Sequence, residues 1–382
     1  MGTEINNKVD IVIIGGGIAG CIAAIALARS YNVVVIDKVN KPLFRIGECL
    51  TPASRRILKK LDLLSGMDNI ITATGQGLHL KNIGTQSYWG TEQMQIVDHL
   101  RNPDGFGWHL DRQRFENYLR ESASKRGAIC LWSTKFRDAH YEDCRWHINA
   151  TTTDDTGNEK TYSTTAKFVI DASGRQAHFA RKLGIKRQHF DKLVACWATL
   201  SNMEQNKMST ISASESGWWY SAPLPNNKRV IALQTDADLL DQKIINDCDL
   251  FIKYAQTNRE IGNILQKNRG DIELHKTVSA NSTRLNQFAG KQWAAIGDAA
   301  MSFDPLSSQG IFSAMISALE LTEMIADTSF MIDLNATKME HFQNIHTLRM
   351  DQIWASYLKQ KNSFYLEEMR WKEAVFWIRR HN

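Results

Sequence analysis

The chain has 382 residues, of which 43% are hydrophobic and 23% are charged, and its formal net charge is +5 at pH 7. Such values are ordinary for a globular protein with a large core, and they argue against a disordered chain. Lysine and arginine are scattered without a long basic run and no apolar stretch reaches membrane-spanning length, so we expect neither a nucleic acid nor a membrane as partner. The 6 cysteines form no C-x-x-C motif and show no zinc-ligand spacing, so we expect a reduced, cytoplasmic protein without a metal site.

A strand, a glycine turn and a helix are predicted at the start of the chain. The apolar run 10–14 ends in a G-x-G-x-x-G turn, and a helical run follows it as far as residue 28. A second strand at 33–36 ends on Asp37, an acid roughly 20 residues after the glycines. Strand, turn, helix, strand and acid in this register are typical of a dinucleotide-binding βαβ unit.

The turn residues have separate expected roles in such a unit. Gly15 permits the tight turn, Gly17 lets the backbone approach a pyrophosphate, and Gly20 lets the helix pack on the strand. The N-terminus of the helix, which contains Ala19, offers free N–H groups and a positive dipole end to the phosphates. Asp37, followed by Lys38, completes the predicted site.

The periodicity of the remaining chain predicts both helices and strands. The expected elements after Asp37 are a helix at 53–63, short strands at 78–80 and 86–89, a helix at 111–125, strands at 128–132 and 167–170, an antiparallel group of strands over 193–233, helices at 239–256 and 259–266, a strand at 294–296, a helix at 309–326 and a largely helical stretch from 338 to the end.

Two later segments distinguish flavin binding from nicotinamide binding. Gly297 and Asp298 follow a predicted strand, where the carboxylate can accept hydrogen bonds from a ribityl hydroxyl. The loop D-P-L-S-S-Q-G at 304–310 then opens a helix, whose positive end would stabilise the anionic reduced flavin. Taken alone, Pro and Ser at a helix start are ordinary capping residues. The residues of this loop and helix start that we expect at the cofactor are Pro305, Ser308, Gln309, Gly310 and Ile311.

A third turn is expected to approach the cofactor, because the strand at 167–170 leads into D-A-S-G, with Asp171 and Gly174 at its ends. The three motifs occur in an order that resembles the group A flavoprotein monooxygenases, the p-hydroxybenzoate hydroxylase-like superfamily. The segments 45–52, 107–112 and 217–223 resemble the branch of that superfamily that holds tryptophan halogenases and their non-halogenating relatives.

This resemblance implies an α/β fold with FAD as cofactor. Arg45, Gly47 and Arg112 would contact FAD; the weaker alternatives place Arg45 in an exposed loop and Arg112 on a helix surface. The implied architecture is a Rossmann-type FAD domain of p-hydroxybenzoate hydroxylase type, an antiparallel-sheet substrate domain and a helical C-terminus. The expected boundaries are 1–77, 101–192 and 286–330 for the FAD domain, 78–100 and 193–285 for the substrate domain, and 331–382 for the C-terminal segment.

The chain departs from the halogenase pattern in two motifs. The halogenase signature W-x-W-x-I-P reads W-W-Y-S-A-P at 218–223, and the halide loop S-T-G reads S-Q-G at 308–310. Lys81 is the nearby candidate for the lysine that carries activated halogen, but it cannot be placed in register and also suits a strand surface. A flavin-dependent halogenase or hydroxylase of a small or carrier-bound aromatic is therefore the weaker interpretation.

The loop 304–310, the strand 217–225 and the tail 365–380 resemble the flavoproteins that mature cysteine tryptophylquinone amino-acid oxidases. These flavoproteins oxygenate a tryptophan in a partner protein's precursor. The resemblance implies a monooxygenase that uses O2 and a quinoprotein oxidase precursor as its partner. Because no second dinucleotide motif is evident, the electron donor could be NAD(P)H or a separate flavin reductase. A flavin-stabilised maturation chaperone that does not oxygenate is the alternative of another class.

Four residues are candidates for the catalytic site. Trp218, Tyr220 and His109 could line the substrate face or move protons, and Glu48 could hold a proton near the flavin. Each also has a structural interpretation. Trp218 and Tyr220 alternate along a strand and could be core residues, His109 could be a buried hydrogen-bonding histidine, and Glu48 could be a loop acid that binds backbone.

The last residues of the chain combine aromatic and basic side chains. Trp371 and Trp377 lie close in sequence to Arg370, Arg379 and Arg380. Aromatic residues with arginine are typical of the centre of a protein interface. The same residues are also compatible with a C-terminal helix that packs on its own domain.

Overall fold

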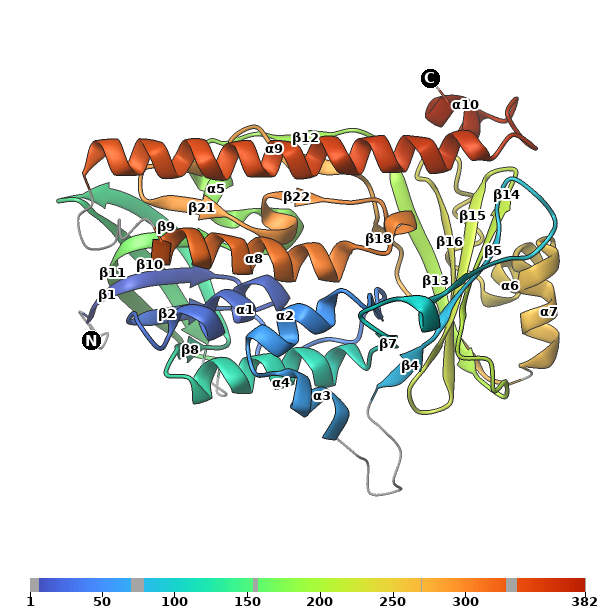
Figure 1. Ribbon diagram of the computed structural model, residues 1–382, viewed down its shortest axis with the longest axis horizontal. Helices are drawn as coiled ribbons and strands as arrows, with labels where there is room; N and C mark the ends of the chain where they lie inside the picture. Colours follow the sequence, from blue (N-terminus) through green and yellow to red (C-terminus); the bar gives the residue numbers. More distant parts are fainter. Residues whose placement is uncertain (1–6, 70–78, 154–156, 269, 328–334, 382) are drawn as a thin grey trace.

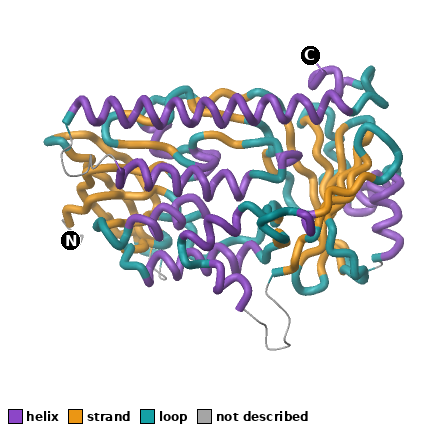
Figure 2. The backbone as a smooth tube through the Cα atoms, in the orientation of Figure 1, coloured by secondary structure: helices purple, strands orange, loops and turns teal. Residues whose placement is uncertain are grey.

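The computed structural model describes residues 7–69, 79–153, 157–268, 270–327 and 335–381. Two eight-stranded β-sheets lie at opposite ends of an elongated molecule, with helices between them and one long helix near the C-terminus, α9, along one side (Figures 1 and 2). This mixed α/β architecture confirms the predicted fold class.

The helices of the described residues, with short 3₁₀ helices labelled η, are given in chain order. They are α1 Ile18–Leu27, α2 Ser54–Lys60, α3 Leu64–Asn69, η1 His99–Arg101, α4 Arg112–Lys125, η2 Gly174–Gln176, α5 His178–Lys182, α6 Cys248–Gln256, α7 Arg259–Lys267, η3 Gly297–Ala299, η4 Pro305–Ser307, α8 Gly310–Asp327, α9 Ala336–Glu367 and α10 Val375–His381.

The strands follow the same order. They are β1 Asn7–Ile14, β2 Val33–Ile36, β3 Cys49–Leu50, β4 Leu80–Asn82, β5 Gly84–Tyr88, β6 Gln95–Asp98, β7 Gly107–His109, β8 Ile129–Leu131, β9 Thr134–Glu142, β10 Arg145–Thr153, β11 Glu159–Asp171, β12 Arg187–His189, β13 Leu193–Ser201, β14 Ser209–Ser214, β15 Gly217–Leu224, β16 Lys228–Asp236, β17 Ile272–Leu274, β18 Val278–Ser279, β19 Thr283–Leu285, β20 Ala289–Gly290, β21 Trp293–Ala295 and β22 Met301–Ser302.

The first large sheet has the order β20-β21-β11-β1-β2-β8, with β9 and β10 continuing from β11 as an antiparallel meander. Its central strands β21, β11, β1, β2 and β8 are parallel. Side chains of β1 alternate between two cores. Ile11 and Ile13 pack with α1, α4 and α8, whereas Val12 and Ile14 pack on the opposite face. Burial on both faces explains the continuous apolar run in this strand.

The second large sheet has the order β17-β13-β16-β15-β14-β5-β6 and is antiparallel except where β14 meets β5. The expected antiparallel group over 193–233 is therefore confirmed. Residues of β15 alternate in direction, so Trp219 contacts Phe251 of α6 at a centroid distance of 5.7 Å. Trp218 and Tyr220 belong to the opposite face of the sheet, which turns toward the first sheet.

Several expected elements have different boundaries. The helix expected at 239–256 begins only at Cys248, because the side chain of Asp247 caps it by accepting hydrogen bonds from two backbone N–H groups. The strand expected at 167–170 is the end of the much longer β11. The C-terminal helical stretch is interrupted between α9 and α10, and residue 78 of the expected strand 78–80 lies outside the described residues.

Helix α9 runs along the molecule from the first sheet to the second (Figure 1). Phe342 packs in the core of α1 and α8, Trp354 packs on the other face of the first sheet, and Tyr365 packs with Trp218 of the second. One helix therefore carries contacts to both halves of the molecule.

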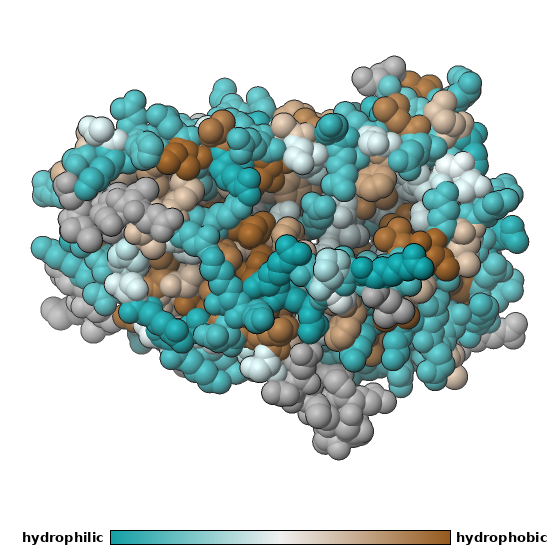
Figure 3. Space-filling view, in the orientation of Figure 1, coloured by the Kyte–Doolittle hydropathy of each residue, from teal (hydrophilic) through white to brown (hydrophobic). Residues whose placement is uncertain are grey.

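No helix of the described residues combines the length and apolar character needed to cross a membrane. On the face drawn in Figure 3, apolar residues form separate patches among hydrophilic ones.

Candidate active site

A cavity of about 740 Å³ lies where the ends of the parallel strands of the first sheet approach β13, β15 and β16 of the second. The edge at the carboxyl ends of parallel strands is the usual place for a ligand in such sheets. Three predicted catalytic residues line it, namely Glu48, Trp218 and Tyr220. The predicted cofactor residues that line it are Gly15, Gly17, Ala19, Asp37, Lys38, Arg45, Gly47, Arg112, Gly174, Asp298, Pro305, Ser308, Gly310 and Ile311.

The glycine turn after β1 provides both close packing and open space. Gly15 has φ +108°, and a Cβ there would lie 2.3 Å from the carbonyl oxygen of Ala172. A Cβ on Gly20 would lie 1.9 Å from the carbonyl oxygen of Gly15. A Cβ on Gly17 or on Gly310, by contrast, would meet nothing within 4 Å. The N-termini of α1 and α8 therefore open onto the cavity with space in front of them, as an anionic ligand requires.

Asp37 organises the turn from its place at the end of β2. Its carboxylate accepts hydrogen bonds from the N–H of Gly16 at 2.6 Å and of Val39 at 2.7 Å. Arg120 of α4, which the sequence analysis did not single out, lies 3.3 Å from the same carboxylate and stacks over Trp132 at 4.2 Å. The acid and the arginine together hold the glycine turn against the following loop.

Arg45 and Arg112 share one carboxylate. Both guanidinium groups lie 2.6 Å from Glu116, which is buried on α4. Burial alone would raise the pKa of Glu116, but the charges of Arg112 and Arg45 hold that pKa below its usual value. Arg112 also donates to the carbonyl oxygen of Gly47. The two arginines were predicted from the sequence motifs, whereas the glutamate that orients them lies in a helix and carries no motif.

Two predicted cofactor residues lie behind the cavity wall. Asp171 accepts hydrogen bonds from the N–H and hydroxyl of Ser173 and from the N–H of Ala180, and burial raises the pKa of its carboxyl. Gly297 has φ +55°, and a Cβ there would approach the Cβ of Ala19 to 2.9 Å. These residues shape the two turns that form the wall.

Three further predicted residues also lie outside the cavity lining. Gly20 packs within the turn, and the amide of Gln309 donates to the side chain of Gln360 at 3.4 Å. His109 is fully buried in β7, with Nε2 3.1 Å from the carbonyl oxygen of Lys207, and its Nδ1 has no partner within the described part of the chain. Burial lowers the pKa of His109 to about 4, so its ring is neutral at pH 7.

Glu48 and Tyr220 meet at the wall of the cavity. The hydroxyl of Tyr220 donates to Glu48 at 2.5 Å, and the second carboxylate oxygen accepts the N–H of Gly47 at 3.0 Å. Burial and the charge of Glu48 raise the pKa of Tyr220 well above its usual value. Glu48 thus binds backbone, as its structural interpretation predicted, and also faces the cavity beside a protonated phenol.

A buried hydrogen-bond network links the loop before α8 to the second sheet. Trp218 donates its indole N–H to the hydroxyl of Tyr365 at 3.1 Å, and that hydroxyl donates to Asp304 at 2.8 Å. The N–H of Asp304 donates to the hydroxyl of Tyr357, also on α9. Burial raises the pKa of the Asp304 carboxyl, which lines the cavity. Sequence analysis placed Asp304 in a motif but gave it no partner.

The C-terminal aromatic and basic residues pack on their own protein. Trp377 is fully buried, and Arg380 and Asp236 form an ion pair at 2.7 Å whose two side chains are 6% and 2% exposed. Arg379 also contacts Asp236, and Arg370 pairs with a neighbouring buried glutamate. Trp377 and Arg380 therefore satisfy the packed-helix interpretation, whereas Arg370 and Arg379 are paired within the chain but remain exposed.

The family described as an FAD binding domain matches residues 8–329 of this chain. The chain belongs to this family. FAD is its cofactor, and the protein is a flavin-dependent oxidoreductase, as its relatives also are. The resemblance drawn from the sequence motifs is confirmed. The open space at Gly17 and Gly310 fits a cofactor that must bring a pyrophosphate and a flavin close to backbone.

This FAD-binding chain is similar to one curated protein and to two solved structures that differ in their named activities. It is 27% identical over 379 residues to the putative FAD-dependent oxidoreductase LodB of Marinomonas mediterranea, a match covering 97% of this chain and 96% of the relative. It has a TM-score of 0.82 and 23% identity with CmlS, a flavin-dependent halogenase, over 98% of this chain and 68% of the halogenase. The chain also resembles QhpG, a peptidyl tryptophan dihydroxylase essential for tryptophylquinone cofactor biogenesis. The TM-score is 0.76 at 22% identity, and the match covers 98% of this chain and 79% of QhpG.

Proposed function

We propose that this protein is an FAD-dependent monooxygenase that oxygenates a tryptophan side chain of an oxidase precursor during biogenesis of a tryptophylquinone cofactor. The observation that carries the proposal is the rim of the cavity. Three apolar side chains there remain exposed, namely Leu43 at 66%, Phe44 at 46% and Val278 at 36%. A protein substrate seated on this rim would cover them and exclude water from the site.

The likeness to LodB over most of both chains and the fold shared with QhpG support this proposal. In this interpretation the first sheet and its helices hold FAD, and the second sheet forms the wall that faces the substrate. We assign the reaction to the cytoplasm, because the 6 cysteines are all free. The electron donor would be NAD(P)H or a separate flavin reductase.

We assign the cofactor contacts as follows. The N-terminus of α1 at Gly17 would receive the pyrophosphate, and Asp298 would receive the ribityl chain. The N-terminus of α8 at Gly310 would lie beside the flavin ring and stabilise negative charge there. Arg45 and Arg112, already oriented by Glu116, would contact FAD from the other side.

Bound FAD, once reduced, would supply the electrons that activate O2 for oxygenation. The chain's own residues would orient the indole and control protons. Tyr220 remains protonated because its pKa is raised, and its hydroxyl donates a hydrogen bond to Glu48, which would fix the phenol beside the substrate. Trp218, fixed by its bond to Tyr365, would form the flat wall against which the substrate ring packs. His109 has no assigned role, since it lies outside the cavity lining.

Halogenation of a small or carrier-bound aromatic is the second candidate, favoured by the fold shared with CmlS. Lys81, the candidate for the halogen-carrying lysine, lies exposed on β4 with its ammonium group 4.6 Å from the ring centroid of Phe106. It does not line the cavity. This position argues against transfer of halogen through Lys81.

The deciding experiment is co-expression with a quinoprotein oxidase precursor, followed by intact mass measurement and peptide mapping of the precursor. We expect one tryptophan to gain the mass of one or two oxygen atoms, with free tryptophan a very poor substrate because binding energy from the partner is absent. A chlorine or bromine isotope pattern in the product would favour the halogenase. Stoichiometric maturation without flavin turnover would favour the flavin-stabilised chaperone, and normal maturation by a variant unable to bind FAD would overturn the monooxygenase proposal.

A further inference from the structure

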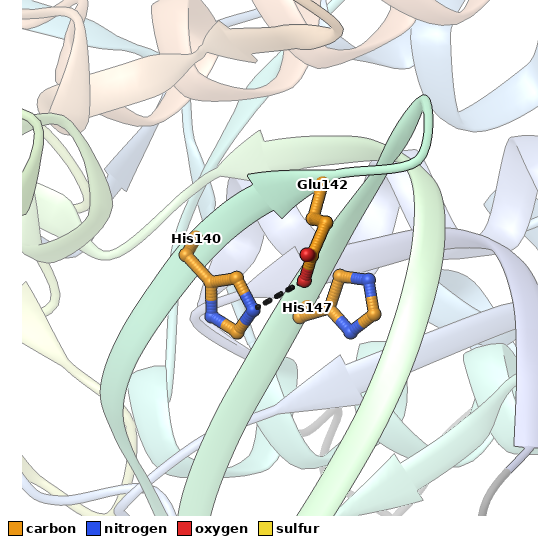
Figure 4. Close-up of side chains that lie close together, drawn as sticks. All are labelled: His140, Glu142 and His147. Carbon is orange, nitrogen blue, oxygen red and sulfur yellow. Dashed lines mark ion pairs between the residues drawn. The ribbon is translucent and has the colours of Figure 1, made fainter.

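A cluster of three metal-ligating side chains lies on the β9–β10 hairpin, away from the FAD cavity. His140 and Glu142 come from β9, and His147 comes from β10 (Figure 4). His140 and His147 are directly opposite each other in the strand register. Glu142 is two residues after His140, so it lies on the same face of the strand. None of the three lines the cavity.

The ligand atoms are already close together. One ring nitrogen of each histidine and one oxygen of the glutamate all lie within 4.8 Å of one another. Nε2 of His140 is 3.6 Å from the carboxylate, and the two imidazole rings stack with centroids 4.8 Å apart and an interplanar angle of 13°. A tetrahedral zinc ion with bonds of about 2.1 Å holds its ligand atoms roughly 3.4 Å apart. Small side-chain rotations would therefore bring the three ligand atoms to the spacing that a bound zinc ion requires.

The hairpin keeps the backbone of these residues in place. β10 pairs with β9 on one side and with β11 of the first sheet on the other, so the two histidines are anchored before any ion binds. Arg145 lies opposite Glu142 in the strand register. Its guanidinium donates a hydrogen bond to the carbonyl oxygen of Val9 at 3.3 Å.

A buried hydroxyl lies next to the cluster. Thr165 is paired with His147 in the register of β10 and β11. Its hydroxyl oxygen is buried and has no hydrogen-bond partner among the described residues. Metal-bound imidazoles commonly donate their second N–H to such an oxygen, which fixes the ring and its tautomer.

We propose that His140, Glu142 and His147 bind one divalent transition-metal ion of the zinc class. Two imidazoles and one carboxylate form a ligand set that suits Zn²⁺, with water in the remaining position. The bound ion would join β9 to β10 and stabilise this part of the FAD-binding half by mass action. The site is independent of the oxygenation chemistry and adds a second ligand to the protein.

The test is a titration of untagged, chelator-treated holoprotein with ZnCl₂, measured by calorimetry. The exposed thiol of Cys144 lies in the hairpin turn and would itself bind zinc, so every protein carries Cys144→Ser. We expect one saturable equivalent, lost in His140→Ala and in His147→Ala and weakened about tenfold or more in Glu142→Gln. His341→Ala, at an exposed histidine of α9, is the matched control and should bind zinc normally.

The FAD absorbance of each variant shows that it is folded. Replacement of zinc by Cu²⁺ should give an electron paramagnetic resonance spectrum with coupling to two nitrogens. The absence of saturable binding in the Cys144→Ser protein, or unchanged binding in both histidine variants with normal FAD content, would overturn the proposal.

Discussion

The glycine turn at 15–20 lines the cavity and the C-terminal segment at 365–381 packs behind its wall, but the two depend on different information. The conformation of the turn depends on the space around its backbone, and that space is set by residues close in the sequence or in the adjacent strand. The C-terminal segment depends on partners far away in the chain. Tyr365 bonds to Trp218 across 147 positions, and Arg380 bonds to Asp236 across 144. A motif made of glycines is therefore informative by itself, whereas a cluster of aromatic and basic residues acquires its role only from what packs against it.

The largest effect is expected at the turn. Gly17→Val should abolish FAD binding, because its side chain would fill the open space that the pyrophosphate needs, while the apoprotein should unfold near the wild-type temperature. Gly20→Ala is the contrasting variant, since its Cβ would strike the carbonyl of Gly15 and destabilise the fold itself. Flavin absorbance and thermal unfolding of both apoproteins check this. Full FAD content in Gly17→Val would contradict the assignment of the turn.

At the C-terminus the largest effect is expected on stability. Asp236→Asn should lower the free energy of unfolding by about 3–5 kcal/mol, because it leaves the charge of Arg380 buried without a counter-ion. Asp238→Asn removes an exposed ion pair with Arg379 and should cost less than about 1 kcal/mol. Denaturant unfolding of the two variants measures the difference. Equal losses would mean that the buried pair does not anchor α10.

A smaller effect is expected where the C-terminal segment contacts two residues of the cavity wall. Tyr365→Phe keeps the ring but leaves Asp304 and the indole N–H of Trp218 without this partner, which should cost about 1–3 kcal/mol. If the network positions the flavin loop, the flavin absorbance should also shift and more of the O2 consumed should be lost as hydrogen peroxide. Tyr31→Phe, on a partly buried tyrosine far from this network, is the control. An unchanged spectrum and unchanged coupling would leave Tyr365 with a packing role only.

The effect that is smallest at neutral pH is a pH dependence of stability, which comes from two buried histidines. Burial lowers the pKa of His109 and of His346 to about 4, against about 6.5 in the unfolded chain. The unfolded state therefore binds more protons between these values. Stability is fully present above pH 6.5 and falls toward pH 4, by up to about 1.4 kcal/mol per pH unit for each histidine.

Replacement of one of these histidines tests the assignment. His346→Gln should make the slope of unfolding free energy against pH shallower between pH 4 and 6.5, whereas His341→Gln, at an exposed position, should leave it unchanged. An identical slope in wild type and His346→Gln would show that His346 is not responsible.

Much of the fold and of the cofactor site could be predicted from local patterns. The G-x-G-x-x-G turn, the G-D turn and the loop before α8 are stretches in which backbone conformation, helix ends and small residues define the function. Their order along the chain indicated the family, which the match over residues 8–329 confirms. The meander of β9, β10 and β11 was missed, because only its last strand was recognised as apolar and the rest alternates with polar residues on an exposed face.

The sequence by itself determined the cofactor class, the order of the elements and the residues whose small size leaves room for FAD, because these depend on neighbours in the chain. Only the tertiary structure decided that Glu116 orients Arg45 and Arg112, that Tyr365 holds Asp304, and that the side chain of Arg380 is buried against Asp236. It also brought His140 and His147 face to face. Side-chain hydrogen bonds and ion pairs have no fixed sequence spacing, since their geometry follows from how strands and helices far apart in the chain pack together.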